Sequence, residues 1–460
     1  MTDKKKIRNI IEKKDSVIYF IGIGGISMSA LAEMSLGSAK RVYGSDIRKS
    51  AVTARLESRG IRIRYTQARA NVMEIMPDMV VYSLSISANN PEYVAAKAMG
   101  ILTVSRAEYL GALMESYEMR IGVSGSHGKS TVTAMLGSVL SYASRSPSIL
   151  CGAEISEGTG YIKGEGEYLV YEACEYGDSF LRFSPKVQIM LNLDFDHPDY
   201  FPDIESLKRS FVSLANNTEE LVIINADDAN LRSILPDITA PVVTFSGNSS
   251  SDYRYSVISS ERGRYTFDLF FGDELCGRFT LGIAGKFNVQ NAIAAIIAAR
   301  YVGIPDALVG ESVKAFSGIG RRLELLGTHS GFDLYYDYAH HPCEIEATER
   351  ALRDMGYLKI ATVFSPHTYS RTKALFDGFV SALSRFDSVF ITDIYGAREA
   401  PTVGVSSYSL AEAVRRRGKD AHAIANGEDI IPYMDFGKYD CLVLMGAGDL
   451  DLIKRKTEDL

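Results

Sequence analysis

The sequence predicts an α/β protein built from three consecutive α/β domains. Short apolar runs alternate with helix-like segments along most of the chain, and two of these runs end in a glycine turn that opens a helix. Such alternation is typical of parallel sheets, because each parallel strand returns through a crossover that is usually a helix. The 460 residues also amount to about three domains of roughly 150 residues. We therefore expect domains at residues 1–115, 116–320 and 321–460.

The first predicted domain starts with a strand, a glycine turn and a helix. An apolar run from Ser16 ends in Gly22, Gly24 and Gly25, and apolar residues at helical spacing follow. The further strands are expected at 41–45, 61–65, 79–83 and 101–104. This order of elements predicts a Rossmann-like domain, in which the helix N-terminus behind the glycines can hold a diphosphate.

Asp46 ends the second predicted strand, where an acidic residue binds ribose in dinucleotide-binding folds. The third glycine of that fingerprint is absent, since Ser27 stands in its place. Two interpretations therefore stay open, a phosphate-binding turn and a plain connection between a strand and a helix.

The central domain begins with a second strand, glycine turn and helix from Met119. The turn consists of Gly125, Ser126, His127, Gly128, Lys129, Ser130 and Thr131. Glycines let backbone N–H groups point at phosphate oxygens, the helix N-terminus adds a partial positive charge, and Lys129 adds a full one. Ser130, directly after the lysine, is placed to bind Mg²⁺. Val123 stands where the common phosphate-loop pattern begins with glycine, but the strand–turn–helix context predicts a P-loop ATPase-like domain with a mainly parallel sheet.

Acidic residues gather after two later apolar runs of this domain. The later strands are expected at 168–172, 187–191 and 221–225. Glu172 and Glu175 follow the first of these runs, and Asp194, Asp196 and His197 follow the second. Carboxyl ends of parallel strands meet at one edge of a sheet, so these side chains should converge on the phosphate loop. Hard oxygen ligands and an imidazole beside a triphosphate favour a Mg²⁺ site, and helix capping is the alternative for each acid.

Two further features precede the third domain. The stretch 253–281 alternates apolar and polar residues, which predicts an antiparallel ribbon. Asn288 and Asn291 lie three residues apart on one face of an alanine-rich helix, where their amides could reach an adenine or a ribose. N-capping by Asn288 is the alternative.

The third domain is predicted to be Rossmann-like as well. Its strands are expected at 334–336, 360–364, 389–392 and 441–445. Asp337, His340 and His341 follow the first of these, and His367 and Arg371 follow the second. Two neighbouring strand ends rich in histidine and arginine favour a polar site over buried structural histidines.

Composition argues against several other classes of protein. The chain has 50 Lys+Arg against 57 Asp+Glu, a net charge of −7, so we expect no nucleic-acid partner. Five cysteines without a CxxC pair fit neither a disulfide framework nor a zinc ribbon, and they favour the cytoplasm. Neither an apolar leader nor a run of 18 apolar residues is found, so no membrane partner is expected.

Taken together, the motifs resemble the Mur ligase family, the ATP-dependent amide-forming enzymes of peptidoglycan precursor synthesis. The resemblance covers essentially the whole chain, in the family's order. The motifs are GIGG with GSD, YSLSISANNPE, GSHGKST, YEACE, NLDFDHPDY, GKFNVQNA, GIGRRLE, DYAHHP, PHTYSRT and MGAGD. Within the family they are most similar to members that join L-alanine to UDP-N-acetylmuramate, which implies these two substrates with ATP and Mg²⁺ as cofactors.

The resemblance also implies roles for individual residues. Lys129 and the loop amides would hold phosphates, and the metal ligands would be Ser130, Glu172 and His197. Nucleotide would be held by Asn288, Asn291, Arg321, Arg322 and Asp337. The UDP-sugar would be bound by Gly22, Gly24, Gly25, Asp46 and Ser83. The amino-acid site would be lined by His340, His341, His367 and Arg371, with Arg371 as the anchor of the carboxylate. The expected catalytic residues are Lys129, Glu172, His197, His340 and Arg371.

Several alternatives stay open from the sequence. A nicotinamide-dependent oxidoreductase would use the first glycine turn, and a P-loop motor or transporter ATPase would need no UDP-sugar. A recycling ligase that joins a ready-made peptide to UDP-N-acetylmuramate shares nearly every motif. The motifs also do not separate alanine from glycine or serine, or a monomer from a homodimer.

Overall fold

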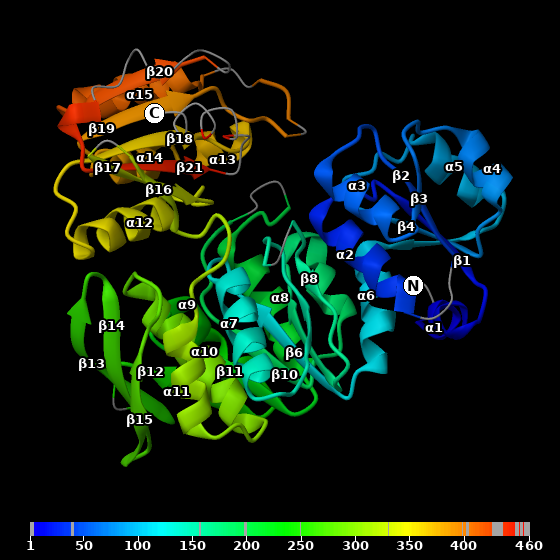
Figure 1. Ribbon diagram of the computed structural model, residues 1–460, viewed down its shortest axis with the longest axis horizontal. Coiled ribbons are helices and arrows are strands. Elements are labelled where there is room, and N and C mark those ends of the chain that lie inside the picture. The colour runs from blue at the N-terminus through cyan, green and yellow to red at the C-terminus, as the bar shows by residue number, and fades with distance from the viewer. Residues whose placement is uncertain are drawn as a thin grey trace.

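The chain folds into three α/β bodies, each built on a sheet of its own (Figure 1). The computed structural model describes residues 4–37, 41–155, 158–196, 200–248, 250–329, 331–397, 399–401, 404–425, 436–446, 450 and 454. The predicted three-domain α/β architecture is confirmed. The predicted boundaries at 115/116 and 320/321 stay predictions, and both fall in segments between sheets.

The first sheet has the order β3-β2-β1-β4-β5, and all its pairs are parallel within the described residues. Its strands are β1 (Val17–Ile21), β2 (Arg41–Ser45), β3 (Arg62–Arg64), β4 (Met79–Tyr82) and β5 (Leu102–Ser105). Its helices are α1 (Lys4–Glu12), α2 (Ile26–Met34), α3 (Ala51–Ser58), α4 (Arg69–Ile75), α5 (Pro91–Ala98) and α6 (Arg106–Leu113), with short 3-10 turns η1 (Ser35–Gly37) and η2 (Met114–Ser116). The order, which extends outward on both sides of β1, is that of a Rossmann-like sheet.

The central sheet has the order β15-β14-β13-β12-β11-β10-β6-β9-β7-β8. Its strands are β6 (Met119–Ser124), β7 (Ser148–Leu150), β8 (Tyr161–Ile162), β9 (Tyr168–Glu172), β10 (Val187–Met190), β11 (Leu221–Asn225), β12 (Val242–Ser246), β13 (Tyr253–Glu261), β14 (Arg264–Phe271) and β15 (Glu274–Thr280). Its helices are α7 (Lys129–Tyr142), α8 (Ile204–Asn216), α9 (Ala229–Ile234), α10 (Phe287–Tyr301) and α11 (Asp306–Ala315), with 3-10 segments η3 (Tyr176–Arg182) and η4 (Leu235–Asp237). The middle of the sheet is parallel, and β13, β14 and β15 pair antiparallel, as the alternating pattern predicted.

The third sheet has the order β16-β17-β21-β18-β19-β20 and is parallel except for the hairpin of its first two strands. Its strands are β16 (Glu324–His329), β17 (Phe332–Asp337), β18 (Ile360–Ser365), β19 (Ser388–Thr392), β20 (Asp420–Ile424) and β21 (Cys441–Gly446). Its helices are α12 (Pro342–Asp354), α13 (Tyr369–Ala374), α14 (Phe376–Leu383) and α15 (Ser407–Arg416), with the 3-10 turn η6 (Phe436–Lys438). Each strand range predicted from the sequence ends within two residues of the observed strand.

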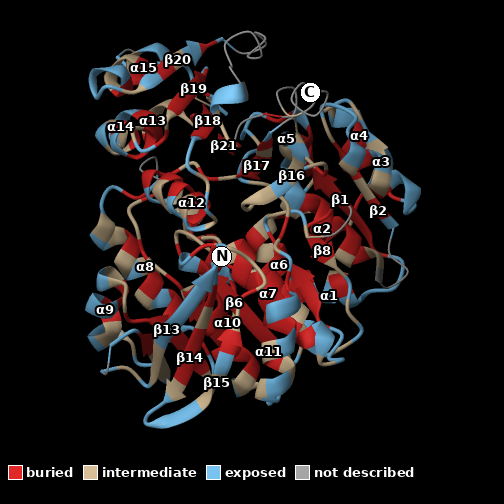
Figure 2. Ribbon diagram, turned by 60° about the vertical axis from the view of Figure 1, so that its left-hand side comes forward, coloured by how far each residue is buried: buried red, intermediate tan, exposed pale blue. Residues whose placement is uncertain are grey.

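The buried strands of the three sheets form the cores, which Figure 2 shows in red between the covering helices. One apolar cluster runs without interruption from the first domain into the central one, since Phe20 and Tyr109 belong to the same cluster as Phe180 and Phe211. The two apolar clusters of the third domain contain residues of that domain only. The first two domains therefore share a core, whereas the third is attached by other means.

Two sets of contacts attach the third domain to the rest of the chain. Near the tip of the antiparallel ribbon, the Tyr265 hydroxyl donates to Asp354 at 2.5 Å, and Gly263 approaches Met355 so closely that a Cβ would lie 2.8 Å from its Cγ. The other contacts join the phosphate-loop edge of the central sheet to α12 and α13. No helix within the described ranges has the length and apolar character needed to cross a membrane.

Candidate functional site

The phosphate loop connects β6, in the middle of the central sheet, to α7. Gly125 has φ +140° and Gly128 has φ +85°, and a Cβ at Gly128 would lie 2.6 Å from the Asn291 side-chain oxygen. Both positions therefore require glycine. Helix α7 starts at Gly128 without a capping side chain. Backbone N–H groups at such an uncapped helix N-terminus can bind an anion.

Lys129 folds back over this loop. Its Nζ donates to the carbonyl oxygens of Gly125 at 2.5 Å and Ser126 at 3.2 Å, and it lies 3.1 Å from the buried Glu175 carboxylate. Burial lowers the pKa of Lys129, but the charge and hydrogen bond of Glu175, together with the charges of Cys174 and Glu172, more than offset burial, and the pKa lies above its ordinary value. The lysine is therefore a cation that Glu175 neutralises.

Two oxygen-bearing side chains meet beside the lysine. Ser130 Oγ donates to Glu172 Oε2 at 2.8 Å, and the same oxygen accepts the N–H of Gly152 at 2.8 Å. A hydroxyl and a carboxylate in contact fit Mg²⁺, which uses few protein oxygens and completes its shell with water and phosphate. His197, the third predicted ligand, lies outside the described residues. Among the residues that are described, no three His, Cys, Asp or Glu side chains form a metal-binding group.

His127 bridges the central and third domains. Asn192 holds its backbone by accepting its N–H at 2.7 Å and donating to its carbonyl oxygen at 3.1 Å. The ring nitrogens lie 3.1 Å from Asp194 and 3.1 Å from Glu344 of α12. Burial lowers the pKa of this imidazole, but Glu344 and Asp194 together raise it to about 9. His127 is therefore a cation at neutral pH, and it ties the phosphate loop to the third domain.

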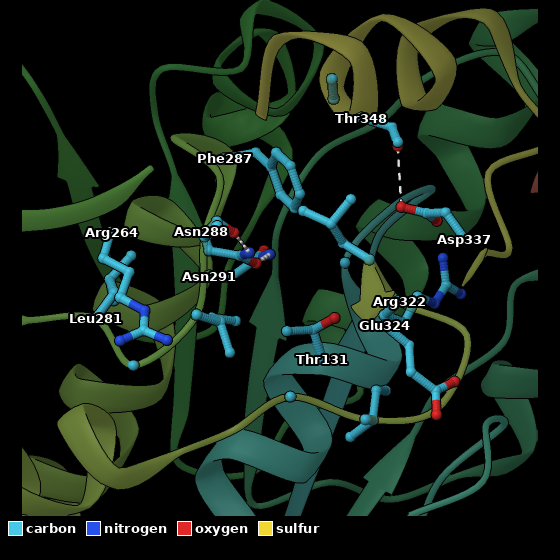
Figure 3. Close-up of a pocket in the computed structure, with 18 of the residues that line it drawn as sticks. Thr131, Arg264, Leu281, Phe287, Asn288, Asn291, Arg322, Glu324, Asp337 and Thr348 are labelled. Atoms are coloured by element: carbon cyan, nitrogen blue, oxygen red, sulfur yellow. Dashed lines mark hydrogen bonds between the residues drawn. The ribbon is translucent and has the colours of Figure 1, made fainter. Parts of the chain in front are cut away.

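A cleft of about 1990 Å³ lies between the central and third domains (Figure 3). Asn288 and Asn291 line its central-domain side, and Arg322 and Asp337 line the opposite side. Asn288 does not cap α10, because Lys286 occupies the N-cap position and the Asn288 amide donates to Ala284 at 2.7 Å. The capping interpretation is therefore wrong for Asn288.

Asp337 ends β17 at the wall of this cleft. It accepts from Thr348 Oγ1 at 2.9 Å and from the Ala339 N–H at 3.0 Å. Burial raises the pKa of Asp337 to about 6. Arg321 and Arg322 lie over the rings of Tyr336 and Tyr338, which orients their guanidinium groups at the same wall.

The residues of the third domain that were predicted to bind the amino acid lie close together, and one residue of the central domain contacts them. Arg371 donates from Nε and Nη2 to a single oxygen of Asp196, at 3.0 and 2.7 Å, and both side chains are buried. Its Nη1 lies 2.9 Å from His367 Nδ1, and the His367 and His340 rings are 6.0 Å apart. Asp196 thus occupies the guanidinium fork that the sequence assigns to the carboxylate of the amino acid. Neither Asp194 nor Asp196 caps α8, whose N-cap is Asp203.

The glycine turn of the first domain has no lysine. Gly22 has φ +75°, and the Gly24 N–H donates to Asp46 at 2.8 Å. A Cβ at Gly24 would lie 2.8 Å from the same carboxylate oxygen. Gly25 starts α2 without a side-chain cap. Ser83, after β4, bonds to Ser85 at 3.1 Å.

Sequence reasoning missed Glu344, an acidic residue of α12 that contacts three residues of the site. Besides His127, it lies 3.3 Å from His340 Nδ1 and 3.8 Å from Arg322. A signal was present, because His341 and Glu344 form a capping box at the start of α12, with the acid three residues after the N-cap. Glu175, which neutralises Lys129, was predicted to lie at the carboxyl edge of the central sheet, but its ion pair with Lys129 was not predicted.

The loop, the lysine and the Ser130–Glu172 pair are typical of a nucleotide-dependent enzyme, and residues of the third domain form one wall of the cleft beside them. Three family models match the chain in the same order: the Mur ligase family catalytic domain at residues 17–118, the Mur ligase middle domain at 123–299, and the Mur ligase glutamate ligase domain at 321–448. The chain belongs to the Mur ligase family.

Similar proteins cover the chain from end to end. The UDP-N-acetylmuramate–L-alanine ligase of Caldicellulosiruptor bescii is 39% identical over 95% of this chain and 98% of its own length. The enzyme of the same name from Acetivibrio thermocellus is 40% identical over 94% of this chain and 93% of its own. The crystal structure of UDP-N-acetylmuramate-alanine ligase from Thermotoga maritima has a TM-score of 0.82 at 26% identity and covers 96% of this chain and 99% of that one. A murein peptide ligase from Psychrobacter arcticus shares the fold, with a TM-score of 0.72 at 22% identity over 96% of this chain and 98% of its own.

Proposed function

We propose that this protein joins L-alanine to the lactyl carboxylate of UDP-N-acetylmuramate, with conversion of ATP to ADP and phosphate, as a step of peptidoglycan precursor synthesis. The observation that carries the proposal is the end-to-end similarity to alanine ligases, at about 40% identity, together with a phosphate loop that carries Lys129 and Ser130. Its five cysteines are all free thiols, in keeping with action in the reducing cytoplasm.

The chemistry requires a carboxylate to become an acyl donor. A carboxylate reacts poorly with an amine, so ATP first converts it to an acyl phosphate. Such a phosphoryl transfer depends on in-line positioning and on neutralisation of charge, which Lys129, the α7 N-terminus and the His127 cation would supply. For Lys129 to contact phosphate, its ion pair with Glu175 must loosen, since both partners now satisfy one another.

We assign Ser130 and Glu172 to Mg²⁺, with His197 as a further ligand implied by the family motif. Bound there, the ion would neutralise phosphate charge. The two oxygen atoms already touch at 2.8 Å, so a single ion could contact both after their hydrogen bond is replaced.

The cleft between the central and third domains would take the nucleoside part of ATP. The amides of Asn288 and Asn291 face it from α10, and Arg321 and Arg322 supply positive charge from the linker. Asp337 is buried and has two donors already, so a ribose hydroxyl would be a third donor to its carboxylate.

The remaining sites would bind the other two substrates. Gly22, Gly24 and Gly25 with Asp46 would hold the UDP part, and Ser83 lies at the end of the neighbouring strand β4. Arg371 would bind the carboxylate of alanine in place of Asp196, because a guanidinium fork binds a carboxylate through two hydrogen bonds. His340, His341 and His367 line the same region.

One assay tests the whole proposal. Phosphate release is measured with ATP, Mg²⁺ and UDP-N-acetylmuramate against L-alanine, glycine, L-serine and a murein tripeptide. We expect release with alanine at the highest kcat/KM and none without the sugar nucleotide. A preference for the tripeptide would instead make this protein a recycling ligase, and release without UDP-N-acetylmuramate would exclude both ligases.

A further inference from the structure

Four histidines meet where the third domain touches the phosphate loop, and their neighbours fix different protonation states. In His127 both ring nitrogens face carboxylates, Glu344 on one side and Asp194 on the other, each at 3.1 Å. Nδ1 forms a hydrogen bond with Glu344, whereas Nε2 lies within ion-pair distance of Asp194 without forming a hydrogen bond. Two carboxylates this close to one imidazole favour its protonated form. His127 is therefore an imidazolium with no lone pair for a substrate.

His340 is held in one neutral tautomer. Its Nδ1 lies 2.9 Å from the carbonyl oxygen of Tyr338 and 3.3 Å from Glu344 Oε2. Both neighbours accept hydrogen bonds only, so the proton is on Nδ1 and the lone pair is on Nε2. Within the part of the chain that the structure describes, no residue forms a hydrogen bond with Nε2, and the His340 side chain is 17% exposed. The basic nitrogen of His340 is accordingly open to a ligand.

His341 is held in the opposite tautomer. Its Nδ1 caps α12 by accepting the Cys343 N–H at 3.4 Å, which places the proton on Nε2. That Nε2 is buried and has no hydrogen-bond partner among the described residues. Its ring lies 5.1 Å from the ring of His127, beside the phosphate loop. A buried N–H donor without an acceptor, next to the site of phosphate chemistry, points to an anionic oxygen of the reacting group.

The fourth histidine is already engaged. His367 Nδ1 lies 2.9 Å from Arg371 Nη1, and because a guanidinium only donates, this nitrogen accepts. His367 thus supports Arg371, the proposed anchor of the amino acid. Of the four rings, only His340 has a lone pair without a partner among the described residues, and it lies between His367 and the Glu344 carboxylate that contacts the phosphate loop.

We propose that His340 Nε2 accepts the proton of the attacking amine and that His341 Nε2–H donates to the oxyanion that forms, an inference that rests on the proposed function. The ammonium of alanine loses one proton to His340, and its nitrogen lone pair forms the bond to the acyl carbon. The carbonyl electron pair moves to the oxygen, which the His341 N–H stabilises. The pair then returns, the bond from carbon to phosphate oxygen breaks, and phosphate leaves. The new amide nitrogen then loses a second proton to water, and the first proton passes from His340 to the leaving phosphate, so that His340 is neutral again.

The charges around His340 suit a base at neutral pH. Burial and Arg371 of α13 lower the pKa of His340, whereas Glu344 of α12 and Asp196 of the loop after β10 raise it, and the pKa lies below its usual value. The ring of His367, after β18, also faces it. For His341, burial and the neighbouring His127 cation lower the pKa to about 4, so that His341 stays a neutral donor. Both rings are therefore in the required form above about pH 6.5.

The test uses two asparagine variants of the full-length enzyme. In His340→Asn the amide nitrogen can still donate to the Tyr338 carbonyl oxygen, but the basic nitrogen is gone. In His341→Asn the amide oxygen can still cap α12, but the Nε2–H donor is gone. Alanine-dependent phosphate release is followed across pH 5.5–9. Formation of acyl phosphate is followed separately, by trapping with hydroxylamine in place of alanine. Hydroxylamine is neutral at pH 7 and needs no base.

We expect His340→Asn to lower kcat with alanine by about 100-fold and to remove the acidic limb of the pH profile, with hydroxamate forming at the wild-type rate. His341→Asn should lower kcat by about 100-fold, with both nucleophiles, and keep the acidic limb. The control His367→Asn should raise the KM for alanine and also keep that limb. The role of His340 as the base is overturned if His340→Asn keeps the acidic limb of the pH profile, or if its rates of hydroxamate and amide formation fall equally. The role of His341 as the donor is overturned if His341→Asn keeps the wild-type kcat. A wild-type enzyme that makes no amide from alanine would refute the proposed function instead.

Discussion

Two turns in this molecule share one backbone design, a strand followed by glycines and the start of a helix, yet they are held in different ways. The turn after β1 is tied within its own domain, by Asp46 and by the backbone of Ser45. The turn after β6 is held within its own domain by Asn192 and Asp194 after β10 and by Glu175 after β9, and in addition by Glu344 of the third domain. It also carries two cations, Lys129 and His127.

The same turn, a strand followed by glycines and a helix N-terminus, therefore occurs in two different settings. A helix N-terminus alone can hold an anion, which is sufficient where a substrate is only bound. Where charge moves during the reaction, full positive charges and contacts to several elements are present as well. Substitutions in both turns and in their partners test this division.

Lys129→Ala should lower ligation by more than about 1000-fold and leave the affinity for UDP-N-acetylmuramate unchanged, because the two turns lie in different domains. Calorimetry measures the affinity and phosphate release measures turnover. The variant also leaves Glu175 as a buried carboxylate without its cation, so Lys129→Ala with Glu175→Gln is the matched control. Recovery of activity in the double variant would show that the buried charge, and not the missing lysine, caused the loss.

Arg371→Lys should raise the KM for alanine by about 10- to 150-fold, since a point ammonium cannot form two parallel hydrogen bonds worth roughly 1.5 to 3 kcal/mol. The KM values for ATP and UDP-N-acetylmuramate should change little. Alaninamide, which has no carboxylate, should be a poor substrate for the wild type and lose little more in the variant. If all three KM values rise together, Arg371 serves only to attach the third domain through Asp196.

Glu172→Gln should raise the Mg²⁺ concentration for half-maximal activity about tenfold, because an amide oxygen is a weaker ligand for a hard cation than a carboxylate. Titration of activity with MgCl₂ at saturating substrates measures this. Glu175→Gln is the comparison variant, since Glu175 bonds to Lys129 rather than to Ser130. A larger shift in that variant would assign the metal to Glu175.

Gly24→Ala should weaken binding of UDP-N-acetylmuramate by about tenfold, with ATP-dependent steps unchanged at saturating sugar nucleotide. The added Cβ would lie 2.8 Å from Asp46, which has to give up its bond to the Gly24 N–H. At Gly25 the nearest atom to a Cβ is 3.6 Å away, so Gly25→Ala should keep the melting temperature. Equal affinities of both variants and the wild type would leave the turn without a role in binding.

The ion pairs of His127 should make the stability of the fold depend on pH, with a smaller effect than any of the substitutions. The pKa of His127 is about 9 in the fold and about 6.5 in the unfolded chain, so its pairing stabilises the fold fully below pH 6.5 and is lost as the pH rises through 9. The contribution is at most about 3 kcal/mol. Thermal unfolding at pH 7 and pH 9.5 should show a larger loss for the wild type than for His127→Gln. Parallel losses would mean that the imidazole is not charged in the fold.

Much of this fold follows from local patterns. Strand, glycine turn and helix repeat at both turns because the apolar period changes at glycine, and each predicted strand is found. Helix α1 was not predicted, because its apolar face is only Ile7 and Ile11 with Ile10 at the edge, in a segment otherwise rich in lysine. That face is buried by tertiary packing, which no local signal reports.

The site was predictable where the residues follow neighbouring strands at one edge of a sheet, and not where two domains meet. Lys129, Ser130 and Glu172 come together because parallel strands end at one edge. The partner of Arg371 is 175 residues away in the chain, and that of His127 is 217 residues away. Such pairs depend on how the third domain is placed, and the sequence pattern of each motif is silent on that placement.

The shared core of the first two domains has a mechanical consequence. Bodies joined by a continuous apolar cluster move as one block, whereas a body joined by ion pairs can separate along that seam at modest cost. The third domain has two supports, the ionic seam at the phosphate loop and the ribbon tip where Tyr265 meets Asp354. If the ion pairs at the phosphate loop break while the contact at the ribbon tip stays, the third domain would rotate about the ribbon tip as a hinge. His340, His341 and Arg371 would then move away from the central domain. The reactants would then enter between the central and third domains on the side of the phosphate loop. The residues for amide formation would reach the site last, when the third domain closes.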